Sequence, residues 1–586
     1  MHDIVIRGGT IIDGTGRPAF TGDVAVEGTS IAAVGGKLGP ARREIDAHGL
    51  LVTPGWVDVH THYDAQALWD PFLSPSSWHG VTTVLFGNCG VGFAPAKAEH
   101  RASLIELTEG VEEIPGAVLA EGLEWDWESF PEFLDALERK PRTLDIGAQI
   151  AHLPLRVYVM GERAIRRESA TADDIRRMRD LTVEALRAGA FGFTTSRTDS
   201  HKSPSGELVP SRYSESEELV GIGAALGMVG TGAFGMNSDF DDERAELDWI
   251  TKLAKDTGRP VWFLLTDRYR DPGRWKRLLA GVHAARQAGA NVTAQIAGRP
   301  IGVIMGVGTA LNPFTIRPSY RTIERLPIPE QLERLRDPSF RARILAEKPT
   351  DSEVEKLSQF RQYVTSRWDK IFVMGDPPDY EPPPEQSVAA LAQAQGRTPD
   401  EVAYDYMTSG ESGPAGTGRF LFFPVVNYTQ PDHEPIRQML TDSGTLLGLS
   451  DGGAHCASII DAGVPTYMLM HWGRDRARGP RLPLELLVKR QTSETADFFG
   501  FGDRGRLAPG LRADVNVIDY EGLKIRQPEF VSDLPGGGLR LVQRVQGYQA
   551  TLVAGTPVFE RGEHTGAMPG KLVRNKVPEK VASAAD

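Results

Sequence analysis

Cysteine is nearly absent from this chain. Only Cys89 and Cys456 occur among 586 residues. Two thiols are too few for the disulfide framework that stabilises many small secreted proteins. We therefore expect a reducing environment and a cytoplasmic location.

Long apolar runs and concentrated positive charge are lacking as well. No apolar stretch approaches the roughly 20 residues that cross a bilayer, and residues Met1 to Arg7 do not have the basic and apolar segments of a signal peptide. The 65 Lys and Arg residues are outnumbered by 78 Asp and Glu residues, which gives a net charge of −13. Nucleic acids and anionic membranes bind through a concentrated basic surface, so neither is expected as a partner.

The composition that is present is typical of an ordered globular protein. Hydrophobic residues make up 40% of the chain and charged residues 24%. A chain of this length exceeds what one core accommodates, so two or more domains are expected. Short strand-like segments separated by turns come first and predict a small β unit, at residues 3–12, 23–26, 31–34 and 51–52.

After this β unit, strand-like runs alternate with amphipathic helices. Residues 81–86 predict a buried strand, residues 171–188 a helix that Thr171 caps three residues before Asp174, and residues 190–195 the next strand. Repeated strand-helix units indicate a parallel sheet, and about eight of them in one domain predict a TIM-like (β/α)8 barrel of the α/β class.

Both chain ends differ from this middle region. Residues 1–54 and 500–586 predict a small β-sandwich built from both ends, finishing in a tail, and residues 55–499 predict the barrel. Residues from about 311 to 430 fit the barrel rhythm poorly, because they are rich in proline and charge. They predict an insertion over the barrel mouth, and plain surface packing is an equally good interpretation.

Two histidines follow a strand-like segment that the Pro54-Gly55 turn opens. Side chains two apart on a strand point to the same face, so His60 and His62 are expected side by side. Two neighbouring imidazoles at a strand end can hold one metal ion. The alternative is a pair of histidines that only satisfy hydrogen bonds at a strand-loop junction.

Two further candidates stand where catalytic groups of a barrel are found, at the C-terminal ends of strands. Cys89 follows one predicted strand and is flanked by Gly87 and Gly90, and Asp451 follows the last one in the run Leu449 to Gly453. A buried carboxylate is costly unless a cation accompanies it, and a metal on the two histidines would be that cation.

The chemistry of such a site is direct. A divalent ion lowers the pKa of bound water towards about 7 and polarises the carbonyl under attack. Asp451 would then be both a ligand and the proton acceptor, returning the proton to the leaving nitrogen. Zn²⁺ suits a mixture of imidazole, thiolate and carboxylate ligands.

The motifs resemble those of the amidohydrolase superfamily. The resemblance rests on Pro54–His62, His79–Val84 and Gly505–Asp514; His62–Gln66 and Gly87–Gly90 resemble more narrowly the N-acyl-D-amino-acid deacylases, the D-aminoacylases. It covers nearly the whole chain and implies a metal-dependent barrel with a split β-sandwich, and it implies that Cys89 is a metal ligand. Without it, Cys89 would more readily be a buried structural thiol.

The chain departs from the family pattern at three strands. The family has one histidine on each of the fifth and sixth strands for a second metal, but residues 260–268 and 294–300 contain none. The fourth strand offers Thr195-Ser196-Arg197 and no lysine. We therefore predict a single metal held by His60, His62 and Asp451, with Cys89 as a less certain fourth ligand.

Four residues are weaker candidates for substrate binding. His152 follows the third strand, Arg197 and His201 lie after the fourth, and Arg299 after the sixth, where it could pair with a substrate carboxylate. Arg197, His201 and Arg299 are as readily ordinary loop residues, and His152 is more readily a structural histidine. His433, His455 and His471 have a weaker claim still.

These observations favour a metal-dependent hydrolase that cleaves the carbon-nitrogen amide bond of an N-acyl (D-)amino acid or a similar small amide. One alternative is a cyclic-amide or ester hydrolase that uses the same site. Another is a binding protein without catalysis on a degenerate barrel, which the missing histidines favour and the retention of His60, His62 and Asp451 disfavours. Self-association is common among such barrels, although nothing in the sequence marks an interface.

Overall fold

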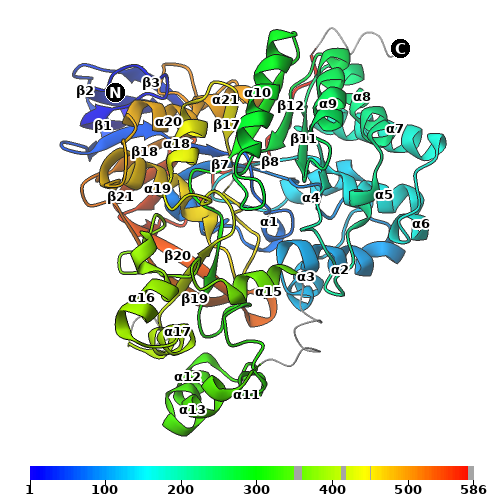
Figure 1. The fold of residues 1–586 in the computed structure, drawn as a ribbon. Coiled ribbons are helices and arrows are strands. Elements are labelled where there is room, and N and C mark those ends of the chain that lie inside the picture. Colours follow the sequence, from blue (N-terminus) through cyan, green and yellow to red (C-terminus); the bar gives the residue numbers. More distant parts are fainter. Residues whose placement is uncertain (349–358, 411–417, 449, 579–586) are drawn as a thin grey trace.

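The chain folds into an α/β structure in which strands from the two chain ends and strands from the middle form separate sheets (Figure 1). The computed structural model describes residues 1–348, 359–410, 418–448 and 450–578. Parts of the predicted insertion (349–358 and 411–417), Leu449 and the end of the predicted tail (579–586) lie outside the described residues.

One sheet joins the beginning of the chain to its end. Its nine strands are β1 (His2–Ile11), β2 (Phe20–Glu27), β3 (Ser30–Val34), β4 (Ala41–Asp46), β5 (Leu51–Pro54), β18 (Val515–Ile518), β21 (Tyr548–Val553), β22 (Thr556–Glu560) and β23 (Glu563–His564). The two ends meet where β5 pairs antiparallel with β18. A separate hairpin consists of β19 (Lys524–Leu534) and β20 (Gly538–Gln546).

Strand β4 has no counterpart in the sequence prediction. Its residues Ala41–Asp46 are mostly charged and exposed, so the strand shows no apolar alternation. It forms because it pairs in parallel with β1 along five residue pairs, a contact that a local pattern does not reveal.

Parallel strands run through the middle of the chain. The first group is β6 (Trp56–Asp58), β7 (Val81–Phe86) and β8 (Asp145–Ala148); the second is β9 (Ile150–Ala151), β10 (Gly192–Arg197), β11 (Ala233–Ser238), β12 (Val261–Leu264), β13 (Val292–Ile296) and β17 (Thr445–Leu447). Only Gln149 separates β8 from β9, and a parallel bridge between Thr61 and Gly452 joins the segments that follow β6 and β17. All neighbouring strands in the two groups are parallel.

Helices connect and cover these strands (Figure 1). They are α1 (Gln66–Trp69), α2 (Arg101–Glu112), α3 (Gly116–Gly122), α4 (Phe130–Glu138), α5 (His152–Met160), α6 (Glu162–Ile165), α7 (Ala172–Ala188), α8 (Ser216–Val229), α9 (Glu243–Thr257), α10 (Arg274–Gln287), α18 (Glu434–Thr441), α19 (Val464–Tyr467), the π-helical η6 (Met468–Asp475), α20 (Leu484–Gln491) and α21 (Ser493–Phe499). The predicted cap of α7 is confirmed, because Thr171 and Asp174 form a reciprocal capping box.

Residues 302–424 form a region with a core of its own. The strands β14 (Gly302–Met305), β15 (Phe372–Val373) and β16 (Leu421–Pro424) make a small antiparallel sheet. Its helices are α11 (Pro318–Arg321), α12 (Ile328–Arg336), α13 (Pro338–Ala346), α15 (Gln359–Ser366), α16 (Val388–Gln395) and α17 (Pro399–Thr408). Val303, Leu332, Tyr404 and Phe423 belong to its apolar cluster, separate from the main core. Figure 1 shows these helices at the lower end of the molecule.

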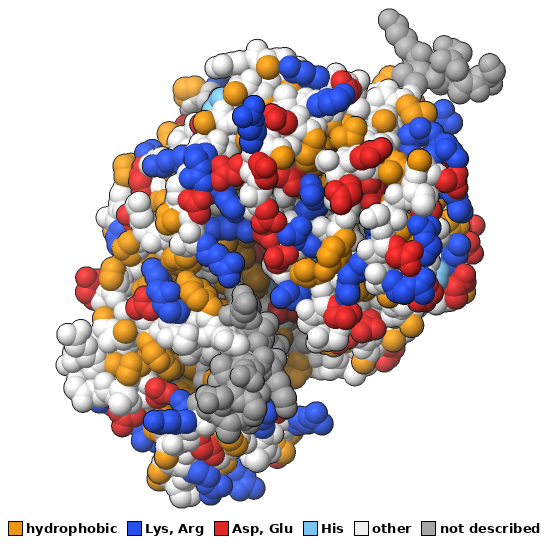
Figure 2. Space-filling model, turned by 45° about the vertical axis from the view of Figure 1, so that its right-hand side comes forward, with side chains coloured by type: hydrophobic (Ala, Val, Ile, Leu, Met, Phe, Trp, Pro, Cys, Tyr) orange, Lys and Arg blue, Asp and Glu red, His pale blue; other side chains and the backbone are white. Residues whose placement is uncertain are grey.

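The visible surface carries both charge signs in mixture. Figure 2 shows Lys and Arg side chains intermingled with Asp and Glu over the whole face in view, with no continuous basic area there. Within the described part of the chain, no helix has both the length and the apolar character that crossing a bilayer requires.

Candidate metal centre

His60 and His62 lie just after β6 and are buried. Between them, the backbone N–H and the hydroxyl of Thr61 both bond to a backbone carbonyl of β7. The His62 N–H donates to the Gly452 carbonyl at 2.7 Å. These bonds fix the backbone that carries both histidines. The centres of the two imidazole rings lie 5.4 Å apart, which is close enough for both rings to bind one ion.

His60 presents its Nε2 atom to the centre. Nδ1 of His60 donates to Gln295 Oε1 at 2.6 Å, so Nε2 carries the lone pair of the neutral ring. Nε2 lies 3.5 Å from Cys89 Sγ and 3.7 Å from Asp451 Oδ1. Burial lowers the pKa of His60 to about 4, which keeps the ring neutral, the form that binds metals.

His62 lies between two carboxylates. Its Nδ1 is 3.2 Å from Glu112 Oε1 and its Nε2 is 3.3 Å from Asp451 Oδ1. Burial lowers the pKa of His62, but the charge of Glu112 and the bond to Asp451 outweigh it and raise this pKa well above its usual value. The site thus favours positive charge at this position.

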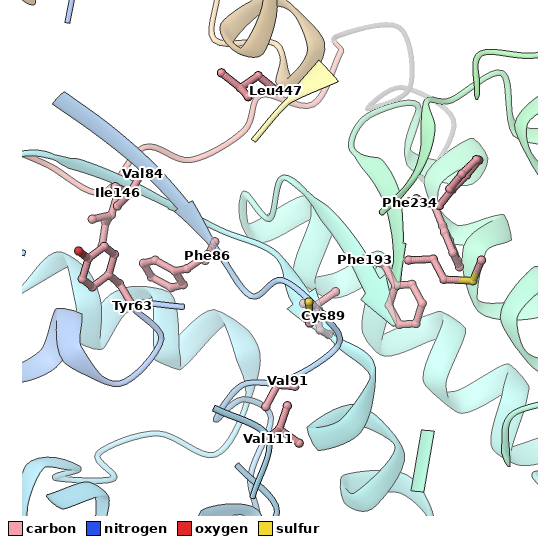
Figure 3. Packing of buried hydrophobic residues seen from close by; sticks show 14 of the residues in the cluster. Tyr63, Val84, Phe86, Cys89, Val91, Val111, Ile146, Phe193, Phe234 and Leu447 are labelled. Carbon is pink, nitrogen blue, oxygen red and sulfur yellow. The ribbon is translucent and has the colours of Figure 1, made fainter. Parts of the chain in front are cut away.

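Cys89 sits in a tight turn that requires glycine on both sides. Gly87, Cys89 and Gly90 all have positive φ values, and a Cβ on Gly87 would come within 2.2 Å of the Gln149 carbonyl oxygen. The Asn88 amide donates to two backbone carbonyls and fixes the turn. Figure 3 shows Cys89 among buried apolar side chains. Burial raises the pKa of Cys89 to about 11, so a thiolate there needs a nearby cation.

Asp451 completes the group from the segment after β17. Burial raises its pKa, but the bond to His62 and the charges of His62 and His60 outweigh burial and bring the pKa down to about 2. Its side chain is 11% exposed, and it faces a cleft. The cleft is lined by residues that include Gln66, Gly452, Cys456, Asp461 and Arg540.

These four residues fit a divalent ion. Ligand atoms of His60, His62 and Cys89 lie within 4.8 Å of one another, and the carboxylate of Asp451 approaches both imidazoles. Two imidazole nitrogens, one sulfur and one carboxylate oxygen form a donor set that zinc accepts. We call His60, His62, Cys89 and Asp451 the metal centre.

Two of the weaker candidates are engaged in buried pairs elsewhere. Nε2 of His152 lies 3.0 Å from a Glu218 carboxylate oxygen, and its Nδ1 lies 2.8 Å from the Thr195 hydroxyl. Arg197 pairs with Glu246 at 2.7 Å. These contacts do not join either residue to the metal centre, and a substrate role for them stays a prediction.

The other two weaker candidates lie nearer to the centre or the cleft. Burial, together with the positive charges of His62 and His455, lowers the pKa of His201 to about 3. Arg299 is fully buried and donates to Asp461 of the cleft wall at 2.9 Å. Its Nε and Nη1 atoms have no hydrogen-bond partner among the described residues.

Glu112 and Gln295 were not predicted as site residues, although they contact the Nδ1 atoms of His62 and His60. Glu112 ends α2, fifty residues beyond His62, and nothing in its local sequence marks it. Gln295 lies on β13, the strand on which the family pattern led us to look for a histidine. An amide side chain inside a buried strand was the available signal for Gln295.

Comparisons with known proteins show the family to which the chain belongs. A model of the amidohydrolase family matches residues 43–559. D-aminoacylase of Alcaligenes xylosoxydans xylosoxydans is 27% identical, with 97% of each chain covered.

Two solved structures are similar in fold. A D-aminoacylase described as having a binuclear metal center has a TM-score of 0.64 at 24% identity, covering 98% of this chain and 100% of that one. N-acyl-D-glutamate deacylase of Bordetella bronchiseptica, complexed with zinc and a phosphonate inhibitor, has a TM-score of 0.62 at 24% identity, covering 98% and 99%.

Proposed function

The chain belongs to the amidohydrolase family, and on that premise we propose that it hydrolyses the amide bond of an N-acyl-D-amino acid with the help of one divalent metal ion. The reaction class is hydrolysis of a carbon-nitrogen bond other than a peptide bond. The observation that carries the proposal is the convergence of His60, His62, Cys89 and Asp451 beside a cleft.

We infer that the parallel strands form a closed (β/α)8 barrel. Support comes from the order of the strands from β6 to β17 and from the bridge between Thr61 and Gly452, which brings the last segment back to the first. The proposed bounds are a barrel at 55–499 with an insertion at about 311–430, and a sandwich from 1–54 and 500–586. The sheet shared by both chain ends supports this division.

Zinc is the ion we propose, held by the four residues of the metal centre. When bound there, it would polarise the amide carbonyl and lower the pKa of the attacking water. A single ion is proposed because β12 and β13 supply no histidine, and β13 instead supplies Gln295 to orient His60.

Asp451 has the position that a proton carrier needs. It is the member of the centre that borders the cleft, and its low pKa of about 2 keeps it a carboxylate at neutral pH. It accepts the proton of the attacking water and passes it to the nitrogen of the leaving amine. The covalent change is one C–N bond broken and one C–O bond formed.

Arg299 is our candidate for the substrate carboxylate. Two of its guanidinium nitrogens lack partners in the described part of the chain, and its bond to Asp461 links it to the cleft wall. A planar guanidinium pairs with a carboxylate through two parallel bonds. The substrate is thus a small molecule that carries one acid group and one acylated amine.

The replacement Asp451→Asn tests the proposal. We expect hydrolysis of N-acetyl-D-amino acids to fall by a factor of about 10³, with unchanged far-UV circular dichroism and unchanged unfolding temperature. Assays on N-acetyl-D- and N-acetyl-L-amino acids, hydantoins and aryl esters identify the substrate class. Full activity of the folded variant would refute the mechanism. Turnover by the native chain of hydantoins or esters alone would favour the cyclic-amide or ester alternative.

A further inference from the structure

A second group of metal-ligand residues lies apart from the metal centre. Glu381, His433 and His471 place one ligand atom each within 4.8 Å of one another. Glu381 and His433 are buried, and His471 is 14% exposed. We call these three residues the Glu381 cluster.

The cluster draws on three separate stretches of chain. Glu381 lies between β15 and α16, in the region that has its own core. His433 immediately precedes α18, and His471 lies in the π-helical segment η6. Helical segments with π geometry often mark functional sites. A group bound here would tie the region of residues 302–424 to α18 and η6.

The tautomer of His433 follows from its hydrogen bonds. Its Nε2 lies 2.9 Å from the Tyr380 carbonyl oxygen, and a carbonyl only accepts hydrogen bonds. Nε2 therefore carries the hydrogen, and Nδ1 presents a lone pair 3.8 Å from Glu381 Oε2. One ring nitrogen thus donates to a backbone carbonyl and the other presents its lone pair. Imidazoles that bind metals usually have this hydrogen-bonding pattern. The Tyr467 hydroxyl lies 3.3 Å from the same Nδ1.

The two oxygens of Glu381 have different surroundings. Oε1 accepts the backbone N–H of His433 at 2.7 Å and lies 3.3 Å from Arg476 Nη2. Oε2 faces the two imidazoles and lies 3.3 Å from Arg476 Nε. Arg476 balances one negative charge but offers no ligand, so Oε2 remains available to a cation.

His471 approaches the same carboxylate oxygen of Glu381 as His433 does. Its Nε2 lies 2.9 Å from Glu381 Oε2, and the lone pair or hydrogen of this nitrogen is therefore directed at the carboxylate. His471 also stacks on Tyr467 at 4.7 Å between ring centres, which fixes the ring with Nε2 towards the carboxylate.

We propose that the Glu381 cluster is a second binding site for a divalent transition metal ion, independent of the metal centre. Two imidazole nitrogens and one carboxylate oxygen suit zinc or cobalt, and the fourth position is left to water. Any proton on His471 Nε2 leaves for solvent when the ion binds. The ion pins Glu381 of the region 302–424 to His433 and His471, so its role is structural.

The test counts ions in a chain whose metal centre has been disabled. The full-length double variant His60→Asn/His62→Asn is stripped with a chelator and titrated with Co²⁺, followed by visible absorption and elemental analysis. We expect one ion per chain. Adding His471→Gln should weaken its binding at least tenfold, whereas adding His283→Gln should not. His283 is the matched control because it also pairs with a carboxylate, Asp442 at 2.9 Å, outside both sites.

Two results would overturn the proposal: a folded double variant that binds no Co²⁺, or an ion that persists at full affinity after His471→Gln. If the double variant does not fold, the same comparison is made in the native chain, where His471→Gln should lower the content from two ions to one. An unchanged content there would also overturn it. Because the readout is ion content, failure here leaves the proposed amide hydrolysis untouched, and that hydrolysis is judged by turnover.

Discussion

At the scale of single residues, the metal centre depends on the side chains that contact the Nδ1 atoms of its two histidines. Gln295 fixes His60 and Glu112 fixes His62, each at the Nδ1 atom opposite the centre. Such partners orient the ring and raise its basicity, and losing one typically costs 10–100-fold in metal affinity. The closeness of His60, His62 and Cys89 was predictable from strand-end positions and the family resemblance, and their role as ligands stays a prediction. The position of Glu112 was not predictable, because only the packing of α2 brings it to His62.

The replacement Glu112→Gln tests this support. We expect zinc affinity to fall by about 10–100-fold, because a neutral amide attracts the His62 ring and its ion less strongly. Competition with a chelator of known affinity measures the change. Glu106→Gln is the control, since Glu106 lies on the same helix but is exposed. Native affinity in Glu112→Gln would show that Glu112 has no such role.

At the scale of elements, buried ion pairs join helices that surround the strands. Glu218 in α8 lies 3.0 Å from His152 and 2.9 Å from Arg156, both in α5. All three side chains are buried. His152 was predicted as a candidate for substrate binding because it follows a strand, but local sequence could not reveal its partner 66 residues away. Conversely, the capping box of α7 lies within four residues, and the sequence predicted it correctly.

Removing the Glu218 charge should destabilise the fold. Glu218→Gln leaves Arg156 buried without its counter-charge, and breaking a buried pair in this way costs about 3 kcal/mol of unfolding free energy. Urea unfolding followed by circular dichroism measures it. The neighbouring Glu217→Gln is exposed and serves as the control. Equal free energies of unfolding for Glu218→Gln and Glu217→Gln would contradict the role of Glu218 as the counter-charge of Arg156.

The same group predicts a dependence on pH. Burial raises the pKa of Glu218, but the bonds and charges of His152 and Arg156 outweigh it and lower the pKa from 4.5 to about 2. A carboxyl whose folded pKa is depressed stabilises the fold above its unfolded pKa and loses that contribution as pH falls towards the folded value. Stability of the native chain should therefore drop more steeply between about pH 4.5 and pH 2 than that of Glu218→Gln. If the unfolding free energies of the two proteins, measured in urea, fell with pH at the same rate, the low pKa of Glu218 would be contradicted.

At the scale of the whole molecule, the alternation of strands and helices was predictable, since it follows from short-range apolar patterns. The participation of both chain ends in β structure was predictable for the same reason. The pairing of β5 with β18 joins residues more than 450 positions apart, and the strand patterns alone do not fix their register. The separate core of residues 302–424 was missed because its proline and charge content disguises a small antiparallel sheet.

The most direct test of the central claim is turnover of N-acetyl-D-amino acids by the native chain before chelation, after chelation and after zinc is returned. The proposed metal centre predicts hydrolysis that chelation abolishes and zinc restores. The proposed function, which rests on the similarity to D-aminoacylase, predicts that the D-enantiomers are preferred over the L-enantiomers. Hydrolysis that survives complete removal of metal would contradict it.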